Sequence, residues 1–356
     1  MQYLIESQLI LEYTLHRTCV GGNKGIQKDL DDGIDTIGKK MTVCQLYAKQ
    51  IRHRGNVRYN TKNGRKRLMK LLEEDKLGGC PIDSVKLSDA KEWAIRMKEK
   101  EISYKTISND KRSLKAAFYT AIQDDCIRKN PFDFQLNTVI EDDTEPKVPL
   151  TPAQEESFLS FAQNDKVYQK YYDELIILLG TGLRISELCG LTDTDIDFEN
   201  RIINVDHQLL RSAETEYYIE TPKTKSGIRQ IPMSEKVYEA FNRVLKRSRG
   251  AKAVTIDGYS NFLFLNRDGY PKTATNYDGM FRGLAKKYNK YHEEALPKVM
   301  TPHTLRHTFC TNMANAGMNP KALQYIMGHS NITITLNYYA HATFDSAKAE
   351  MLRIAA

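Results

Sequence analysis

An acidic stretch that contains two prolines divides the sequence into two parts of different character. The run from Glu141 to Pro149 (EDDTEPKVP) has no apolar periodicity and is expected to be extended and exposed. Directly after it, Thr151-Pro152-Ala153-Gln154 is typical of a helix start, with Thr as N-cap and Gln completing a capping box. Because 356 residues suffice for two cores, we predict a first domain over 41–138, a linker over 139–150 and a second domain over 151–356.

The first of these domains shows the spacing of a small helical bundle. Apolar residues recur at intervals of three and four, which indicates amphipathic helices. The expected helices start near Thr42, surround Leu68 to Leu72, follow Ser88 as N-cap, and run from about Thr106 to Gln123. Residues 1–40 contain glycine-rich breaks and no core pattern, so we expect an irregular segment there.

The positive charge is concentrated in the same segment. Residues 41–140 hold 21 Lys and Arg against 12 Asp and Glu, whereas the whole chain has a net charge of +7. Such a surplus is the footprint of a nucleic-acid-binding module, although a solvated lysine-rich surface would look the same. The side chains expected to meet phosphates are Arg65, Lys66, Arg67, Lys111, Arg112 and Lys115.

Cysteine spacing and hydropathy exclude several classes of protein. The six cysteines, Cys19, Cys44, Cys80, Cys126, Cys189 and Cys310, stand singly, which argues against a zinc or disulfide framework. The sequence has no apolar run of about 18 residues and no signal peptide at its start, so we expect a cytoplasmic protein.

The second domain has a mixed pattern. Leu175–Leu179 indicates a buried helix that ends near Gly182, and Arg201–Val205 alternates like a strand. Residues 217–221 and 229–232 flank Lys225-Ser226-Gly227 and are expected to form a β-hairpin. The predicted fold class is therefore mainly α with a small β-sheet or hairpin (α+β).

Six side chains suit phosphodiester transfer without a metal. Arg184 and Arg306 can hold the non-bridging oxygens, because guanidinium groups match them bidentately and stay charged. Tyr339 is the candidate nucleophile, and its high ordinary pKa calls for a base such as His303. Lys225 would protonate the leaving oxygen, and His329 would donate a hydrogen bond to the phosphate.

Neighbouring residues leave alternatives open. Lys223 lies two positions from Lys225 and shares its face in an extended chain, so it is a second candidate acid and a candidate DNA contact. Tyr338 adjoins Tyr339, but only Tyr339 is followed two residues later by histidine. His303 and His307 have the spacing of a zinc helix, yet Thr304 stands where a metalloprotease has Glu, so no metal site is predicted.

Four short motifs, in order, resemble those of the tyrosine recombinases. They are TGLRISEL at 181–188, HTLRH at 303–307, LQYIMGHS at 323–330, with Met in place of the usual Leu, and YAH at 339–341. The resemblance covers about 41–356 and is greatest to integrases of conjugative transposons. It implies a helical core-binding domain and a catalytic domain that clamp duplex DNA as a C shape, and a 3′-phosphotyrosine intermediate.

The resemblance also implies partners. It predicts integration and excision of a mobile element through a Holliday junction, by a homo-tetramer on element-end DNA in the bacterial cytoplasm. An excisionase and DNA-bending proteins would assist, with no cofactor and no membrane. Such integrases usually carry an N-terminal domain that binds arm sites, and residues 1–40 would be at most its remnant. The amphipathic stretch Phe344–Ile354 would dock on its own or a neighbouring subunit.

Two other functions are compatible with the same residues. A type IB topoisomerase shares the nucleophile chemistry, but the compact helical module at 41–140 favours a recombinase. A catalytically idle DNA-binding regulator is the second alternative, and the competent residue types at all six expected catalytic positions argue against it.

Overall fold

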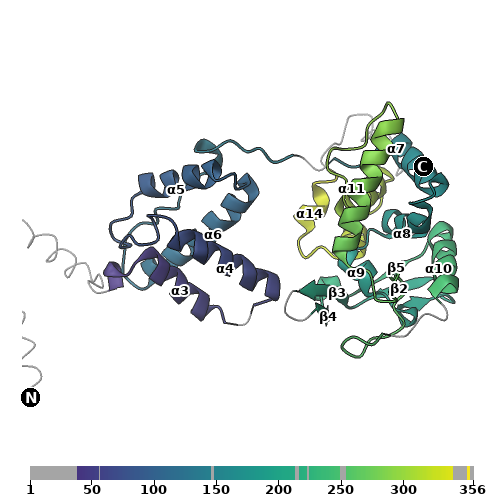
Figure 1. Ribbon diagram of the computed structural model, residues 1–356, viewed down its shortest axis with the longest axis horizontal. Helices are drawn as coiled ribbons and strands as arrows, with labels where there is room; N and C mark the ends of the chain where they lie inside the picture. Colours follow the sequence, from purple (N-terminus) through teal and green to yellow (C-terminus); the bar gives the residue numbers. More distant parts are fainter. Residues whose placement is uncertain are drawn as a thin grey trace, which may run out of the picture. The chain divides into compact units, whose positions relative to one another are not determined.

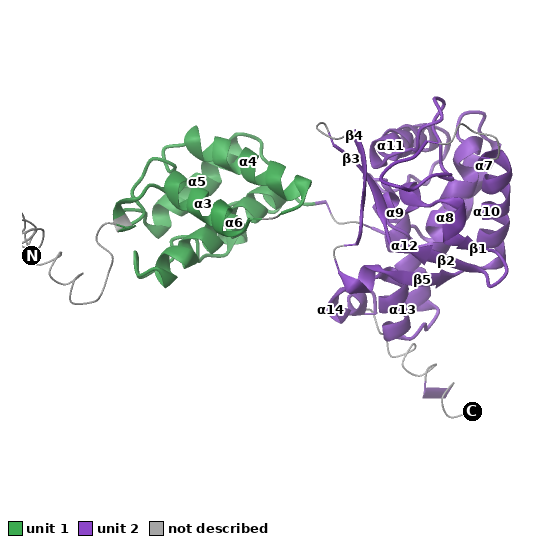
Figure 2. Ribbon diagram, turned by 90° about the horizontal axis from the view of Figure 1, so that it is seen from below, with its two compact units in different colours: residues 1–144 green, residues 145–356 purple. Residues whose placement is uncertain are grey.

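The computed structural model describes residues 38–55, 57–145, 148–212, 216–222, 224–248, 254–339 and 351–352. It contains two compact units, residues 1–144 and 145–356, and the division falls inside the stretch expected to be a linker (Figure 2). The predicted N-terminal segment, apart from 38–40, and the predicted C-terminal helix, apart from 351–352, lie outside the described residues. No helix in the described ranges is long and apolar enough to cross a membrane.

The described part of the first unit contains four α-helices around one core. They are α3 (Val43–His53), α4 (Tyr59–Glu73), α5 (Leu87–Glu99) and α6 (Tyr104–Gln123), with short 3-10 turns η1 (Gly38–Lys40) and η2 (Leu136–Thr138) (Figure 1). Trp93 is fully buried and meets the Phe132 ring edge-on at 5.7 Å. Thr42 caps α3 as expected, but α5 begins one residue before Ser88, because the Asp89 carboxylate caps the Lys86 amide instead.

The second unit is also mainly helical. Its helices are α7 (Pro152–Asn164), α8 (Tyr172–Thr181), α9 (Ile185–Gly190), α10 (Glu235–Ser248), α11 (Ala274–Tyr291), α12 (Pro302–Asn315), α13 (Pro320–Met327) and α14 (Ile332–Leu336). The described part of this unit also contains the 3-10 turns η3 (Gln169–Tyr171), η4 (Asp193–Asp195) and η5 (Lys225–Gly227). Helix α8 has the richest apolar sequence and packs against both α10 and α12, so its C-terminal end is held inside the unit.

Two small antiparallel sheets complete this unit. Strands β1 (Ile196–Asp197), β2 (Ile202–Val205) and β5 (Arg229–Pro232) form one, and β3 (Gln208–Ser212) and β4 (Glu216–Glu220) form the other. The predicted hairpin around Lys225 is therefore wrong, because β4 pairs with β3 while β5 pairs with β2. Pro222 follows β4 and has no amide hydrogen for a ladder, so the chain leaves one sheet before it enters the other.

Candidate active site

Arg184 stands at the junction of α8 and α9. Helix α8 ends at Gly182 in the left-handed conformation, and Arg184 follows as the N-cap of α9. Its Nη1 donates to Glu187 Oε1 at 2.7 Å, and its backbone amide donates to Glu187 Oε2 at 2.8 Å. Its Nη2 donates to the Gly328 carbonyl at 3.1 Å. One face of Arg184 is thus fixed, while about a third of its side chain stays exposed.

Arg306 reaches the same place from α12. Its guanidinium donates to the carbonyls of Gly182 and Met327, so it is tied to the end of α8 and the end of α13. Burial and then the charge of Arg184 lower the pKa of Arg306 to about 9. Arg306 remains a cation at neutral pH, and the two arginines predicted from the sequence form one cationic centre.

Gly182 makes this convergence sterically feasible. Its φ is +63°, and a Cβ placed there would lie 2.5 Å from Phe309 Cδ1 and 2.9 Å from Met327 Sδ. Any side chain would strain the backbone and push α12 and α13 away. Gly182, two residues before Arg184, therefore allows α12 and α13 to pack closely against the end of α8.

His329 follows α13 directly. The helix ends at Gly328 in the left-handed conformation, and His329 is then buried with Nδ1 3.0 Å from the Thr335 hydroxyl oxygen. Burial, followed by the charges of Arg306 and Arg184, lowers the pKa of His329 to about 4. His329 is neutral at physiological pH and lies in the field of both arginines.

The loop that contains Lys225 lies next to the turn formed by Gly328 and His329. Lys225 is exposed at the start of η5, and Lys223 lies outside the described residues. A Cβ on Gly328 would lie 3.0 Å from the Ser226 carbonyl oxygen. The residues that follow Lys225 thus pack against the turn that presents His329.

A buried ion pair lies beneath these groups. Arg229, on β5, donates from Nη1 to Glu187 Oε1 at 3.0 Å and from Nη2 to Glu187 Oε2 at 2.9 Å. Burial alone would raise the pKa of Glu187, but Arg229, Arg184 and Arg306 outweigh it and lower that pKa to about 2. Arg229 was not predicted from the sequence, since an isolated arginine in a short strand carries no local motif.

His303 lies exposed on the first turn of α12, one turn before Arg306. Residues three apart on a helix lie on the same face, so His303 and Arg306 share one side of α12. His307, one turn further along α12, packs against the Tyr338 ring at 4.8 Å between centroids.

Tyr338 and Tyr339 make different contacts. The Tyr339 hydroxyl donates to the Met318 carbonyl at 2.5 Å, and burial followed by nearby Cys310 raises the pKa of Tyr339. Burial and then nearby Cys310 raise the pKa of Tyr338, and the charge of Arg306 opposes that rise. The structure therefore joins Arg184, Arg306 and His329, but it does not bring Tyr339 to the arginines.

The cations predicted to bind DNA in the first unit differ in their surroundings. Arg67 Nη2 donates to both carboxylate oxygens of buried Asp110, at 2.6 and 2.8 Å, and Lys115 pairs with Asp133 at 2.5 Å. Lys111 lies over the Phe134 ring at 4.5 Å.

The remaining three of these cations have neutral partners or exposed side chains. Arg65 donates weakly to the Arg54 carbonyl, Arg112 donates to the Asn109 side chain, and Lys66 is exposed. Arg67 and Lys115 thus already have carboxylate partners within the first unit.

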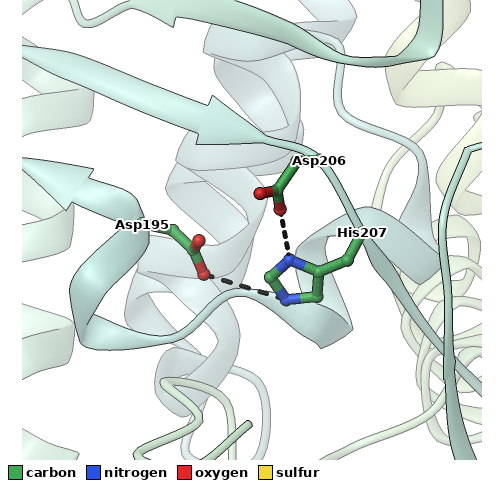
Figure 3. A group of neighbouring side chains, drawn as sticks. All are labelled: Asp195, Asp206 and His207. Carbon is green, nitrogen blue, oxygen red and sulfur yellow. Dashed lines mark hydrogen bonds and ion pairs between the residues drawn. The ribbon is translucent and has the colours of Figure 1, made fainter. Parts of the chain in front are cut away.

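Within the described ranges, one group of acidic and histidine side chains has the proximity of a metal site. Asp195, Asp206 and His207 meet between η4 and the start of β3 (Figure 3). His207 Nδ1 lies 2.6 Å from Asp206, its Nε2 lies 2.8 Å from the Gly190 carbonyl, and Asp195 accepts from Thr192. These contacts satisfy the group internally and tie loops together, so we assign it a structural role.

Comparison with known proteins agrees with this geometry. The phage integrase family matches residues 149–346. The transposase of transposon Tn916 from Enterococcus faecalis is 68% identical over 329 residues, which cover 92% of this chain and 81% of the relative. The integrase of transposon Tn1549, solved with transposon right-end DNA and carrying a Tyr-to-Phe substitution, is 77% identical. It covers 89% of this chain and 100% of its own, with a TM-score of 0.84.

A more distant structure shares the fold alone. The lambda integrase dimer bound to a core site is 15% identical, with a TM-score of 0.59 over 93% of this chain and 84% of its own. The family match spans more than half of the sequence, and the chain belongs to the phage integrase family. Within that family it is a tyrosine recombinase, an integrase of the conjugative-transposon kind that cuts and rejoins DNA.

Proposed function

We propose that this integrase moves a conjugative element by cutting and rejoining DNA at the element ends through a phosphotyrosine on Tyr339. The observation that carries the proposal is the convergence of Arg184, Arg306 and His329 on the Met327–Gly328 turn. The relatives support the choice of DNA, since the Tn1549 integrase was solved with transposon right-end and circular-intermediate DNA.

The arginines would hold the scissile phosphate. Charge grows on the two non-bridging oxygens in the transition state, and prearranged guanidinium donors stabilise it. Arg184 keeps an exposed edge, and Arg306 remains cationic with a pKa of about 9. No metal is required for this part of the chemistry, because the arginines supply the positive charge.

Neutral His329 would act as a hydrogen-bond donor. If the Thr335 hydroxyl donates to Nδ1, the proton of the neutral ring sits on Nε2 and can be given to a phosphate oxygen. A neutral donor avoids adding a third positive charge beside the arginines.

Proton transfer would use the two exposed groups. His303 would accept the proton of the attacking Tyr339 hydroxyl, and Lys225 would protonate the departing 5′ oxygen. Lys223 remains the alternative acid. Tyr339 would first exchange its hydrogen bond to Met318 for a place beside the phosphate, so DNA binding would activate the nucleophile by moving it.

The assembly follows from the reaction. Exchange of two duplexes needs four active sites, so we propose a homo-tetramer in which both units of each subunit clamp the DNA. Strands would exchange in pairs through a Holliday junction, with an excisionase and DNA-bending proteins setting the direction.

The experiment is a trapping assay on a nicked duplex that carries the Tn1549 right-end sequence, in EDTA. We expect wild type and Tyr338→Phe to form a covalent adduct on denaturing gels, and Tyr339→Phe to form none. Loss of the adduct in Tyr338→Phe alone would move the nucleophile by one residue. Binding without any wild-type adduct would favour the idle regulator, and relaxation of plasmid lacking the site would favour a topoisomerase.

A further inference from the structure

We propose that Arg229 is a positioning residue that holds the Lys225 loop against the His329 turn, so that Lys225 can protonate the leaving oxygen. The inference rests on the proposed function, because it assigns Lys225 the acid role. Arg229 itself does not reach the DNA, since its side chain is completely buried.

Arg229 bonds to three separate parts of the site. Its Nε donates to the Ile326 carbonyl at 2.6 Å, in the last turn of α13 before His329. Its Nη1 donates to the Gly227 carbonyl at 3.0 Å, in the turn that contains Lys225. Both terminal nitrogens bond to Glu187, which also holds Arg184. A single side chain therefore links the lysine loop, the histidine turn and the first arginine.

The loop has little room to take another position while these bonds persist. A Cβ on Gly227 would lie 2.3 Å from Pro222 Cβ, and a Cβ on Gly328 would lie 3.0 Å from the Ser226 carbonyl oxygen. The first contact lies within the loop itself, and the second packs the backbone of the loop against the turn that precedes His329. A shift of the guanidinium would move the loop and leave the arginine centre tied by its own bonds to Gly182, Met327 and Gly328.

Only arginine can make this link. The planar guanidinium offers five hydrogens in fixed directions, whereas a lysine ammonium offers three on a flexible stem. Arg229→Lys keeps the positive charge opposite Glu187. The lysine cannot donate hydrogen bonds to the Ile326 carbonyl, the Gly227 carbonyl and both carboxylate oxygens together. The variant should therefore loosen the loop without leaving a buried carboxylate unpaired.

The chemistry of the leaving group distinguishes a misplaced Lys225 from a general loss of activity. In cleavage the Tyr339 oxygen bonds to phosphorus, its proton passes to His303, and the P–O5′ bond breaks as the 5′ oxygen takes a proton from Lys225. If sulfur replaces that 5′ oxygen, the leaving group is a thiolate, which is stable without a proton because thiols have a pKa of about 8.5. A defect in the acid then disappears, but a defect in phosphate binding persists.

The test compares adduct formation on the nicked Tn1549 right-end duplex with either oxygen or sulfur at the scissile 5′ position. We expect Arg229→Lys and Lys225→Ala to be slower on the oxygen substrate, by roughly 100-fold for the misplaced acid, and to approach wild type on the sulfur substrate. Arg184→Ala should be slow on both. The matched control, Arg243→Lys, weakens an arginine pair with buried Asp173 elsewhere in the same unit and should match wild type on both.

Equal slowing of Arg229→Lys on both substrates, or no slowing on either, would overturn the inference, as would a Lys225→Ala defect that sulfur does not rescue. Failure of wild type to form any adduct would instead overturn the proposed function. If Arg229→Lys melts below the assay temperature, Gly227→Ala displaces the same loop against Pro222 with the Arg229–Glu187 pair intact. That variant should show the same rescue by sulfur, and a defect equal on both substrates would again contradict the proposal.

Discussion

The Tyr339 hydroxyl donates a hydrogen bond to the Met318 carbonyl, which belongs to the loop between α12 and α13. A phenol that donates to a carbonyl is protonated, and its raised pKa agrees with that state. The arginines are held by different bonds, to Gly182, Met327 and Gly328. Tyr339, the proposed nucleophile, and the two arginines, the proposed phosphate site, are thus held by separate bonds, and we expect DNA to bring them together.

Fluorotyrosine labelling should report that movement. We expect the ¹⁹F resonance of Tyr339, assigned by its loss in Tyr339→Phe, to shift when right-end DNA binds, because the hydroxyl leaves Met318. The resonance of buried Tyr277, whose hydroxyl donates to Glu174 at 2.6 Å, serves as the control and should stay in place. An unchanged Tyr339 resonance at saturating DNA would show that the contact with Met318 persists in the complex.

Glu187 should make the catalytic unit sensitive to acid. Its pKa falls from 4.5 to about 2 on folding, so its contribution to stability is complete above pH 4.5 and is lost as the pH falls towards 2. A shift of that size corresponds to ~3 kcal/mol. Glu187→Gln leaves Arg184 and Arg229 without their carboxylate and should lower the free energy of unfolding by about 3–5 kcal/mol at pH 7.

Urea unfolding at pH 7 and at pH 3 measures this effect. We expect the difference between wild type and Glu187→Gln to shrink at the lower pH, where Glu187 is largely protonated in the unfolded wild-type chain but still ionised in the folded one. A difference that is equal at both pH values would mean that the carboxylate charge of Glu187 contributes nothing to stability.

Thr335→Val tests how His329 is held. The substitution keeps the shape of a fully buried side chain but removes the hydroxyl that faces Nδ1. We expect the ring to lose its preferred tautomer, and adduct formation to slow by about 10-fold. Because the pKa of wild-type His329 is about 4, its protonation should not affect the wild-type rate between pH 6 and 8. Thr333→Val, an exposed change on the same helix, is the control, and equal rates in all three proteins would contradict the role of Thr335.

Gly182→Ala should disrupt the site through packing. Gly317 has a similar φ of +78°, but nothing lies within 4 Å of a Cβ added there. Gly317→Ala should therefore lower the free energy of unfolding only by the backbone strain, about 1–2 kcal/mol. Gly182→Ala adds the clash with Phe309 and Met327, which should bring a further ~1–3 kcal/mol and reduce adduct formation. Thermal unfolding of both variants measures the difference, and equal melting temperatures would refute the steric argument.

Local signals in the sequence predicted much of this structure. The caps at Thr42 and Thr151 and the glycine that ends α8 each act within a few residues. Arg184 lies two residues beyond that glycine, so its place directly after α8 could be anticipated from the sequence.

The sequence did not predict features that depend on contacts between distant residues. Alternation identified the strands on both sides of Lys225 but could not tell that β4 pairs with β3 and β5 with β2. The role of Arg229 depends on its hydrogen bonds to α9, α13 and η5, which are distant in the sequence and come together only in the fold. The orientation of Tyr339 likewise depends on a carbonyl 21 residues earlier in the chain.

Two arginines of the first unit should affect DNA binding differently. Arg112 is exposed on α6 and donates to the neutral side chain of Asn109, so Arg112→Ala should reduce the slope of log affinity against log salt by about 1. Arg67 is engaged by Asp110, which is 5% exposed, so Arg67→Ala should leave the slope unchanged and lower the melting temperature of the protein. Fluorescence anisotropy with right-end DNA over a range of salt concentrations gives the slopes. A reduced slope in Arg67→Ala at unchanged melting temperature would mean that DNA displaces Asp110 and that Arg67 contacts phosphate after all.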